Sequence, residues 1–373
     1  MSPRTGPVGV GIIGAGNISE QYLATLGRFP DTDVRIVGDV ALDRAEAQAR
    51  RHGVGAWGSA EDVLAHDGVE LVVNLTVPAA HADVSTAALE AGRHVWSEKP
   101  LAVHPLEART LLDRAAAAGL RVGVAPDTVL GPGVQTARRV IARGDIGAVL
   151  SAQTFMQTPG PDAWHPDPEF LFAEGAGPLF DMGPYYLTML VTLLGSVTRV
   201  SAVGSTGRGI RTIRTGARAG TEFAVAVPTH VSALATFESG ASSQSVYSFD
   251  SHLVRSGVVE ITGTEGTLVV PDPNTFAGDV RITRGHSADG AAQWETAGSV
   301  GTGSGRGLGV LDMARAIRTG EPHIATGDLG YHVLDVLTAI DRSVVTGETE
   351  HIGSRAGAVP LVPPDRDPYA ATL

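Results

Sequence analysis

Lys99 lies in the tripeptide Glu98-Lys99-Pro100, at the end of a short apolar run, where its amine could exchange a proton with an alcohol. A lysine amine can hydrogen-bond a hydroxyl group. Partial desolvation would lower its pKa toward neutrality, so that it can act as an acid or a base. Glu98 could orient the amine, and Pro100 fixes the turn that follows. A lysine at a strand end can equally be a solvated surface residue, so the tripeptide alone leaves both interpretations open.

A second candidate pair is Asp181 and Tyr185, which are four residues apart in a helical pattern. Residues with this spacing project from one face of a helix, so the carboxylate can orient the hydroxyl. A Tyr hydroxyl held in that way can pass a proton to or from an alcohol. The alternative is structural, because the helix dipole favours an acidic residue near a helix N-terminus and the Tyr can pack in the core.

Glycines near the N-terminus match the dinucleotide fingerprint G-x-G-x-x-G in two registers that overlap at Gly14. The earlier register lies inside the β-branched run 8–13, so no helix N-terminus is available to it. The later one begins with Gly14 and Gly16, where that run ends, and has a serine in third place that still permits close packing of helix and strand. The later register is therefore the predicted phosphate loop, and Asn17 and Ile18 open the helix whose N–H groups face a pyrophosphate.

Asp39 ends the second predicted strand, at about the ~20-residue spacing of a carboxylate that accepts the ribose hydroxyls of a dinucleotide. Its charge would repel a 2′-phosphate, so NAD is favoured over NADP as the cofactor. Arg44 argues in the other direction, because its guanidinium could pair with that phosphate.

These residues need a scaffold, and the chain up to about residue 124 alternates β-branched runs with amphipathic helical stretches. This alternation predicts a parallel sheet with right-handed crossovers. In such a sheet the ligand crevice lies at the carboxyl ends of the strands, where the phosphate loop, Asp39 and Lys99 all stand. The predicted strands are Val8–Gly14, Val34–Val40, Glu70–Thr76, His94–Glu98 and Arg121–Ala125.

Later in the chain the pattern indicates an α+β domain with a mainly antiparallel sheet. We therefore predict an α/β fold with two domains: a Rossmann doubly wound parallel sheet in residues 1–126 and the α+β domain in residues 127–373. The elements expected in the second domain are a helix over 134–143, a strand over 148–157, a helix over 180–195, strands from 197 to 282 with a hairpin around Ser239–Gly240, a mobile Gly- and Ser-rich loop over 288–309, and two closing helices.

Trp164 and His165 stand in a Pro-rich loop of the second domain. Aromatic and polar groups on a loop suit sugar binding, by stacking and by hydrogen bonds. The alternative is a Pro-rich loop that packs around one Trp.

Composition excludes several classes of protein. The formal net charge of −12 argues against a nucleic-acid or membrane-surface binder, which would need clustered Lys and Arg. The absence of cysteine excludes disulfides and thiolate zinc sites, and the histidines show no metal-ligand spacing. No apolar run is long enough to span a bilayer, so we expect a soluble, cytoplasmic protein without a metal site.

Taken together, four segments resemble the Gfo/Idh/MocA oxidoreductases, which include glucose–fructose oxidoreductase and inositol dehydrogenase. The resemblance covers almost the whole chain, and the Glu-Lys-Pro block after a Thr-x-Pro-x-x-His stretch is its most specific part. It implies a Rossmann domain and a second domain whose large open sheet joins subunits into a homodimer or homotetramer. It also implies a bound nicotinamide cofactor and a carbohydrate-like substrate. The segments are 11–19, 76–103, 141–147 and 175–195.

The resemblance also assigns catalytic roles. Lys99 matches the family's catalytic lysine, and Asp181 matches its active-site aspartate. Tyr185 stands where the family often has histidine and where some members have tyrosine. Because an unperturbed Tyr has a pKa of about 10, Lys99 is the expected base, and Tyr185 would donate or relay a proton.

Further positions match binding residues of the family. Thr76, Pro78 and His81 align with cofactor contacts, and Glu98 and Lys99 are expected to touch the cofactor as well. Asp127 aligns with a substrate-facing position, where it could accept a hydrogen bond from a sugar hydroxyl. Lys99, Trp164, His165, Asp181 and Tyr185 complete the expected substrate site.

The sequence therefore predicts an NAD(P)-dependent oxidoreductase that transfers a hydride between a nicotinamide and a hydroxyl or carbonyl carbon of a sugar, polyol or related carbohydrate. One alternative is a member with tightly bound, internally recycled NAD that performs net elimination, hydrolysis or epimerisation of a glycoside. Another is a nucleotide-binding regulatory protein without turnover.

Overall fold

The computed structural model describes residues 5–286 and 290–373, which form two compact units. The first unit contains the chain up to Pro132 together with 300–334 and 358–373, and the second contains 133–299 and 335–357. The predicted boundary at 126 therefore lies close to the first crossing between the units. The prediction of two consecutive domains differs from the structure, because two C-terminal segments return to the first unit.

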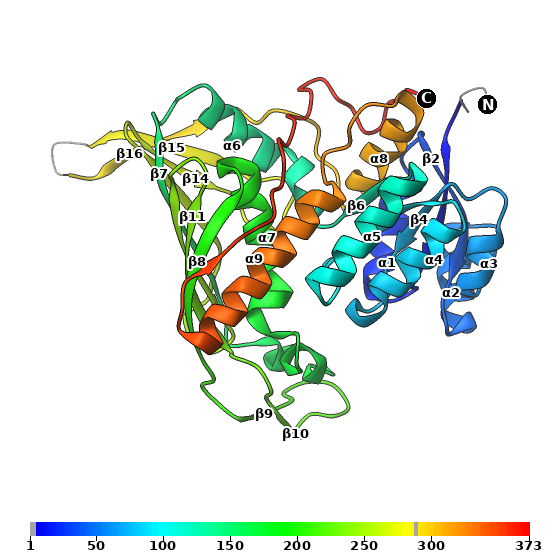
Figure 1. Ribbon diagram of the computed structural model, residues 1–373, viewed down its shortest axis with the longest axis horizontal. Helices are drawn as coiled ribbons and strands as arrows, with labels where there is room; N and C mark the ends of the chain where they lie inside the picture. The colour runs from blue at the N-terminus through cyan, green and yellow to red at the C-terminus, as the bar shows by residue number, and fades with distance from the viewer. Residues whose placement is uncertain (1–4, 287–289) are drawn as a thin grey trace. The chain divides into compact units, whose positions relative to one another are not determined.

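The first unit is built on a six-stranded parallel sheet in the order β3-β2-β1-β4-β5-β6, which confirms the predicted Rossmann-type sheet (Figure 1). The sequence did not predict β3, because a two-residue strand has no periodicity. The strands are β1 (Val8–Ile13), β2 (Thr32–Gly38), β3 (Trp57–Gly58), β4 (Leu71–Asn74), β5 (His94–Ser97) and β6 (Val122–Val124). The helices are α1 (Asn17–Leu26), α2 (Leu42–His52), α3 (Ala60–Ala65), α4 (His81–Glu90), α5 (Pro105–Ala118), α8 (Leu308–Thr319) and the beginning of α9 (Gly327–Thr346).

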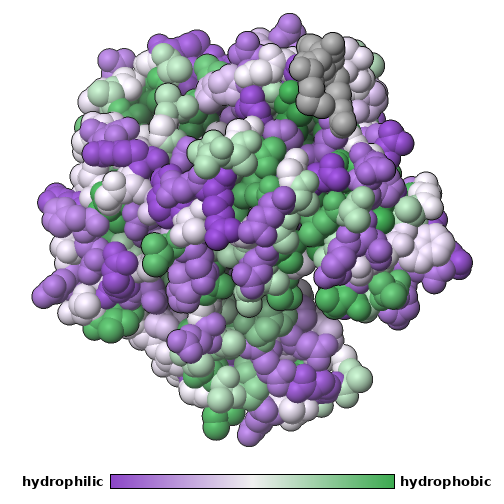
Figure 2. Space-filling model, turned by 45° about the vertical axis from the view of Figure 1, so that its right-hand side comes forward, coloured by the Kyte–Doolittle hydropathy of each residue, from purple (hydrophilic) through white to green (hydrophobic). Residues whose placement is uncertain are grey.

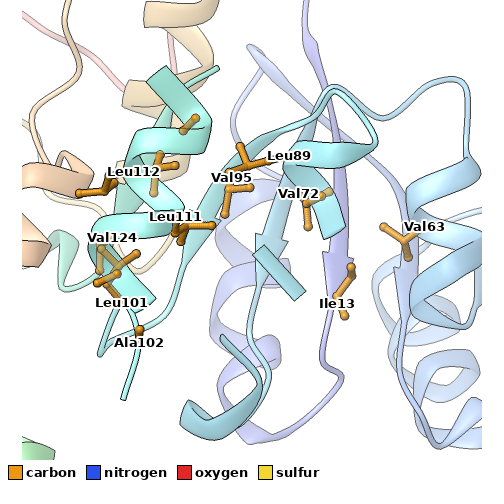
Figure 3. Packing of buried hydrophobic residues seen from close by; sticks show 14 of the residues in the cluster. Ile13, Val63, Val72, Leu89, Val95, Leu101, Ala102, Leu111, Leu112 and Val124 are labelled. Atoms are coloured by element: carbon orange, nitrogen blue, oxygen red, sulfur yellow. The ribbon is translucent and has the colours of Figure 1, made fainter. Parts of the chain in front are cut away.

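Apolar side chains from the strands and from α5 form the core of this unit, among them Ile13, Val72 and Leu111 (Figure 3). Gly11 in β1 has a packing role there, because a Cβ atom at this position would lie 2.6 Å from Cγ1 of Val63. The glycine pattern inside the strand thus allows α3 to approach the sheet closely, and it leaves the phosphate-loop role to the later register.

The C-terminal helices return to the first unit because the sheet has apolar surface still to cover. A Cβ atom on Gly309 in α8 would lie 2.0 Å from the ring of Trp96, and one on Gly330 in α9 would lie 2.8 Å from Cβ of Val124. Trp96 is fully buried by this contact. Residues more than 200 positions apart are involved, so no local pattern in the sequence could predict it.

The second unit contains a nine-stranded sheet in the order β16-β15-β14-β13-β7-β12-β11-β8-β17. Among the strand pairs of the described residues, only β12–β7 is parallel, so the sheet is mainly antiparallel, as predicted. Its strands are β7 (Val149–Gln157), β8 (Val197–Ser205), β11 (His230–Phe237), β12 (Ser242–Ser248), β13 (Arg255–Gly263), β14 (Thr267–Val270), β15 (Val280–His286), β16 (Ala292–Ala297) and β17 (Glu350–His351). A separate ribbon pairs β9 (Ile210–Thr212) with β10 (Glu222–Ala224), and the helices are α6 (Pro132–Ala142), α7 (Gly177–Leu194) and the end of α9.

The predicted hairpin around Gly240 is confirmed, with β11 and β12 antiparallel and Gly240 at φ +86°. Helix α7 and the end of α9 lie along one face of the sheet (Figure 1). They pack closely against each other, since a Cβ atom on Gly183 would lie 2.8 Å from the side chain of Leu337.

The predicted loop over 288–309 needs a correction. Residues 292–297 form the strand β16, which pairs with β15, because backbone pairing at a sheet edge offsets the weak apolar pattern of this segment. Residues 288 and 289 lie outside the described part of the chain.

Within the described ranges, no helix combines the length and the apolar character that crossing a bilayer requires. Figure 2 shows many hydrophilic side chains on the face that it presents, with hydrophobic groups between them.

Candidate active site

The phosphate loop joins β1 to α1 and leaves room for a ligand at its second glycine. Gly14 has φ +108°, and a Cβ atom there would lie 2.6 Å from the carbonyl group of Leu75, so only glycine fits. Gly16 is the N-cap of α1, and a Cβ atom there would meet nothing within 4 Å. The loop is thus a cradle at a helix N-terminus with open space beside it, which fits the pyrophosphate of a dinucleotide.

Asp39 follows β2 and ties this loop to the next one. Its Oδ2 accepts a hydrogen bond from the N–H of Ala15 at 2.7 Å, and its Oδ1 accepts one from the N–H of Ala41 at 2.8 Å. The guanidinium of Arg44 also donates to Oδ1, at 3.2 Å. Asp39 is buried, so the carboxylate expected to bind a ribose already holds the phosphate loop in place.

The segment after β4 is held by a buried asparagine that the sequence analysis missed. Oδ1 of Asn74 accepts hydrogen bonds from the N–H and the hydroxyl of Thr76, and its Nδ2 donates to the carbonyl oxygen of His81 and to the hydroxyl of Ser85. A polar residue ending an otherwise apolar strand was the available signal. Pro78, which begins the short helix η1 (Pro78–Ala80), is exposed.

His81, an expected cofactor contact, is the first residue of α4. Its side chain is buried, with Nδ1 2.6 Å from the carbonyl oxygen of Pro100 and Nε2 3.0 Å from that of Thr76. Burial lowers the pKa of His81, whereas the two carbonyl oxygens act in the opposite direction because each can accept a proton of the imidazolium. The ring thus connects the loops that follow β4 and β5.

The Glu98-Lys99-Pro100 segment follows β5, and its Lys99–Pro100 bond is cis. Buried Glu98 fixes the main chain of Lys99, because its Oε2 accepts the N–H of Lys99 at 3.1 Å. Its Oε1 accepts the hydroxyl of Tyr22 at 2.9 Å, and that hydroxyl accepts from Nε1 of Trp96 at 3.2 Å. Burial raises the pKa of Tyr22 well above its usual value, which keeps it a donor. Tyr22 and Trp96 were not foreseen as support for this segment.

Lys99 is the only lysine among the 28 lysine and arginine residues of the sequence. Arginine cannot be deprotonated in a protein, whereas lysine can. The single lysine is half-buried and lies at the same edge of the sheet as the phosphate loop and Asp39, since all three follow the carboxyl ends of parallel strands.

Asp127 does not have the exposure that contact with a sugar hydroxyl would need. It is fully buried, and its Oδ2 accepts the N–H groups of Gly307 and Gly309 at 2.8 and 3.0 Å, at the N-terminus of α8. Burial raises the pKa of Asp127 to about 6. The carboxylate therefore caps a helix that is distant in the sequence.

The remaining candidates belong to the second unit. Asp181 and Tyr185 lie four residues apart on α7, with Asp181 half-buried and Tyr185 buried. Trp164 is 67% exposed, and its ring lies 5.5 Å from that of His165, which in turn lies 5.4 Å from the ring of Phe170. These three rings form an aromatic cluster with edge-to-face contacts, in which Trp164 and Phe170 are exposed. In the described ranges, no group of three potential ligand side chains could hold a metal ion.

Comparison with known proteins identifies the family to which the chain belongs. Residues 8–125 match the profile described as "Oxidoreductase family, NAD-binding Rossmann fold", and residues 134–269 match the GFO/IDH/MocA C-terminal domain. Trans-1,2-dihydrobenzene-1,2-diol dehydrogenase of Sus scrofa is 29% identical over 273 residues, which are 70% of this chain and 74% of the relative. The 1,5-anhydro-D-fructose reductase of Ensifer adhaerens is 26% identical over 266 residues, which are 69% of this chain and 74% of the relative.

Solved structures share the fold. A levoglucosan dehydrogenase in complex with NADH and L-sorbose superposes with a TM-score of 0.79 at 24% identity, covering 93% of this chain and 99% of that one. An oxidoreductase domain protein from Kribbella flavida gives the same TM-score and identity, covering 94% and 100%. The two profile matches agree with the Rossmann-type sheet and the open second sheet. The chain therefore belongs to the Gfo/Idh/MocA family of oxidoreductases.

Proposed function

We propose that the protein is an NAD-dependent dehydrogenase acting on the hydroxyl-bearing carbon of a sugar, polyol or related carbohydrate. The observation that carries this proposal is the single lysine of the chain, fixed through Glu98 at the sheet edge that holds the nucleotide loop. The names of the relatives support it, because they are dehydrogenases and a reductase of diols and sugar derivatives.

The first unit supplies the cofactor site in this proposal. Gly14, Gly16 and the opening residues of α1, Asn17 and Ile18, hold the pyrophosphate, and Asp39 keeps the loop in position and disfavours a 2′-phosphate. Thr76, Pro78 and Glu98 lie in the neighbouring loops and border the same site. When bound, the nicotinamide accepts a hydride from the substrate carbon or returns one to it.

Lys99 is the proposed base. Its amine hydrogen-bonds the reacting hydroxyl group and takes the proton that leaves as the hydride departs. Asp181 orients the hydroxyl of Tyr185, which donates or relays a proton, and Trp164 and His165 bind the sugar by stacking and hydrogen bonds. Asp127 and His81 are left out of these roles because their side chains are at most 1% exposed and already bond main-chain groups.

Substitution of Lys99 tests the proposal. Lys99→Arg keeps the positive charge but removes a deprotonatable amine, so kcat should fall by about two to four orders of magnitude while the Kd for NAD stays within a few-fold. Lys99→Met should give a similar loss. The assay follows reduced cofactor with a panel of sugars, inositols, levoglucosan and other glycosides. A Lys99→Arg enzyme with wild-type kcat would overturn the assignment.

The same assay separates the redox reaction from internal cofactor recycling. Accumulation of reduced cofactor in proportion to product supports the dehydrogenase. Product without net reduced cofactor would contradict it and indicate an elimination, hydrolysis or epimerisation. Because Lys99 is the only lysine, amine-selective labelling followed by mass spectrometry reports directly on its protection by substrate.

Assembly and location are also proposals. We infer a homodimer or homotetramer formed through the open face of the nine-stranded sheet, and a cytoplasmic location. The alternating burial along β11 supports assembly through this sheet, since Leu234 is 56% exposed on the face opposite the buried side chains. Cell fractionation tests the second.

A further inference from the structure

We propose that the second unit binds a small oxyanion, the carboxylate or phosphate group of a metabolite, in a pocket beside the β9–β10 ribbon. The pocket has a volume of about 120 Å³, which accommodates a group of this size. Arg208, Arg214 and His252 line it together with Asp162 and Asp250. All of these residues belong to the second unit, and the inference does not rest on the proposed activity.

A buried arginine organises the wall of this pocket. The side chain of Arg211 is 1% exposed and donates to Oδ1 of Asp162 at 2.6 Å and to Oδ1 of Asp250. It also donates to the carbonyl oxygens of Pro159 and Phe249, at 3.0 and 2.7 Å. Both carboxylates in the pocket wall therefore share one buried cation.

The two aspartates also fix the main chain beside both lining arginines. Oδ2 of Asp250 accepts the N–H of Gly207, the residue before Arg208, at 3.2 Å. The carbonyl oxygen of Asp162 accepts the N–H of Arg214 at 3.0 Å. The backbone at the two lining arginines is thus held while their side chains remain exposed.

The side chains of Arg208 and Arg214 have no anionic partner in the described ranges, unlike that of the nearby Arg218. Arg218 pairs with Asp167 at 3.2 Å and with Glu169 at 2.7 Å, so acidic residues are available on this part of the surface. Arg208 and Arg214 instead face the pocket.

The charges at the pocket favour an anion. The positive charge of Arg211 balances one of the two carboxylates. Arg208 and Arg214 together carry more positive charge than the second carboxylate carries negative charge, so the pocket has an excess of positive charge. The uncommitted groups are therefore cationic guanidinium forks, which suit the two or three oxygens of a carboxylate or phosphate. An uncharged sugar would leave the excess charge without a partner.

Calorimetric titration of the full-length protein with inorganic phosphate tests the inference. The ionic strength is kept constant with sodium chloride, because salt screens exposed charges. Acetate, a sugar phosphate and the corresponding uncharged sugar form the other arms, which separate a phosphate site from a carboxylate site. Arg208→Gln and Arg214→Gln remove the two cations. Arg199→Gln on β8 is the matched control, since Arg199 is exposed and its Nε donates to the Thr236 hydroxyl at 3.2 Å.

Each pocket variant should weaken binding of the preferred oxyanion by about tenfold, the double variant should abolish it, and the control should bind like the wild type. Circular dichroism and thermal unfolding verify that the variants fold. Two results would overturn the inference: no saturable binding of phosphate, acetate or the sugar phosphate, or an equal loss of binding in Arg199→Gln.

Discussion

Asp39 combines two tasks at the scale of a single residue. Its carboxylate ties the phosphate loop to the loop after β2 through Ala15 and Ala41, and in the proposed function it also repels a 2′-phosphate. The first task concerns the binding of any dinucleotide, whereas the second concerns the choice between NAD and NADP. The two tasks therefore have different consequences for cofactor affinity.

Asp39→Asn separates them. The amide keeps one acceptor oxygen but loses the charge, so NAD should bind about tenfold more weakly. The affinity for NADP should fall less, or rise, because the repulsion of the 2′-phosphate is gone. Fluorescence titration with both reduced cofactors measures the two Kd values. Equal losses for both cofactors would assign Asp39 to the loop alone.

Arg44→Gln is the partner variant, because Arg44 is exposed and donates to Oδ1 of Asp39 at 3.2 Å. It should weaken the binding of NADP more than that of NAD, since this guanidinium lies beside Asp39 and could pair with a 2′-phosphate.

At the scale of elements, Arg211 fastens the β9–β10 ribbon to the rest of the second unit. Its buried guanidinium satisfies two carboxylates and two carbonyl oxygens that come from loops after β7 and β12. Removing one member of a buried charge network leaves the other charges without compensation.

Arg211→Met should therefore lower the free energy of unfolding by about 3–5 kcal/mol. Urea denaturation measures it, with Arg199→Met as an exposed control that should change stability by less than about 0.5 kcal/mol. Equal stability of the two variants would show that the network contributes nothing.

Stability of the whole molecule should depend on the pH through the half-buried His94. Burial, followed by the charge of Arg121, lowers the pKa of His94 to about 4, and its Nδ1 accepts the N–H of Arg121 at 2.9 Å. In the unfolded chain its pKa is about 6.5. Folding thus favours the neutral ring, so its contribution is complete above pH 6.5 and is lost as the pH falls from 6.5 to 4.

His94→Asn keeps an acceptor for Arg121 but cannot take up a proton. Between pH 7 and pH 4.5 the wild type should lose about 2–3 kcal/mol more stability than this variant, measured by urea unfolding at each pH. His351→Asn, at an exposed position of β17, should follow the wild type. Parallel curves for wild type and His94→Asn would contradict the assignment.

Assembly belongs to the same scale. Leu234 on β11 and Val203 on β8 are 56% and 68% exposed, and the strand register places both on the outward face of the nine-stranded sheet. If this face joins subunits, Leu234→Glu should shift the protein toward the monomer, because the charge would be buried in an apolar contact. Light scattering coupled to size exclusion measures the mass. An unchanged mass would place the interface elsewhere or show a monomer.

The sequence by itself determined the features that depend on neighbours along the chain. Strand and helix alternation predicted the parallel sheet, and the end of the run at Ile13 predicted which glycines form the phosphate loop. The Glu98-Lys99-Pro100 block was recognisable because its three residues are consecutive. Periodicity and short motifs record local geometry, so such features can be read without coordinates.

The tertiary structure alone decided which distant groups pair. Asp127 caps a helix 180 residues later, and the ring of His81 lies between the carbonyl oxygens of Thr76 and Pro100. Helix α8 returns to cover Trp96, although the chain order predicted consecutive domains. These outcomes follow from burial, because a buried polar group must find a partner and an apolar surface must be covered, wherever in the chain the complementary group occurs.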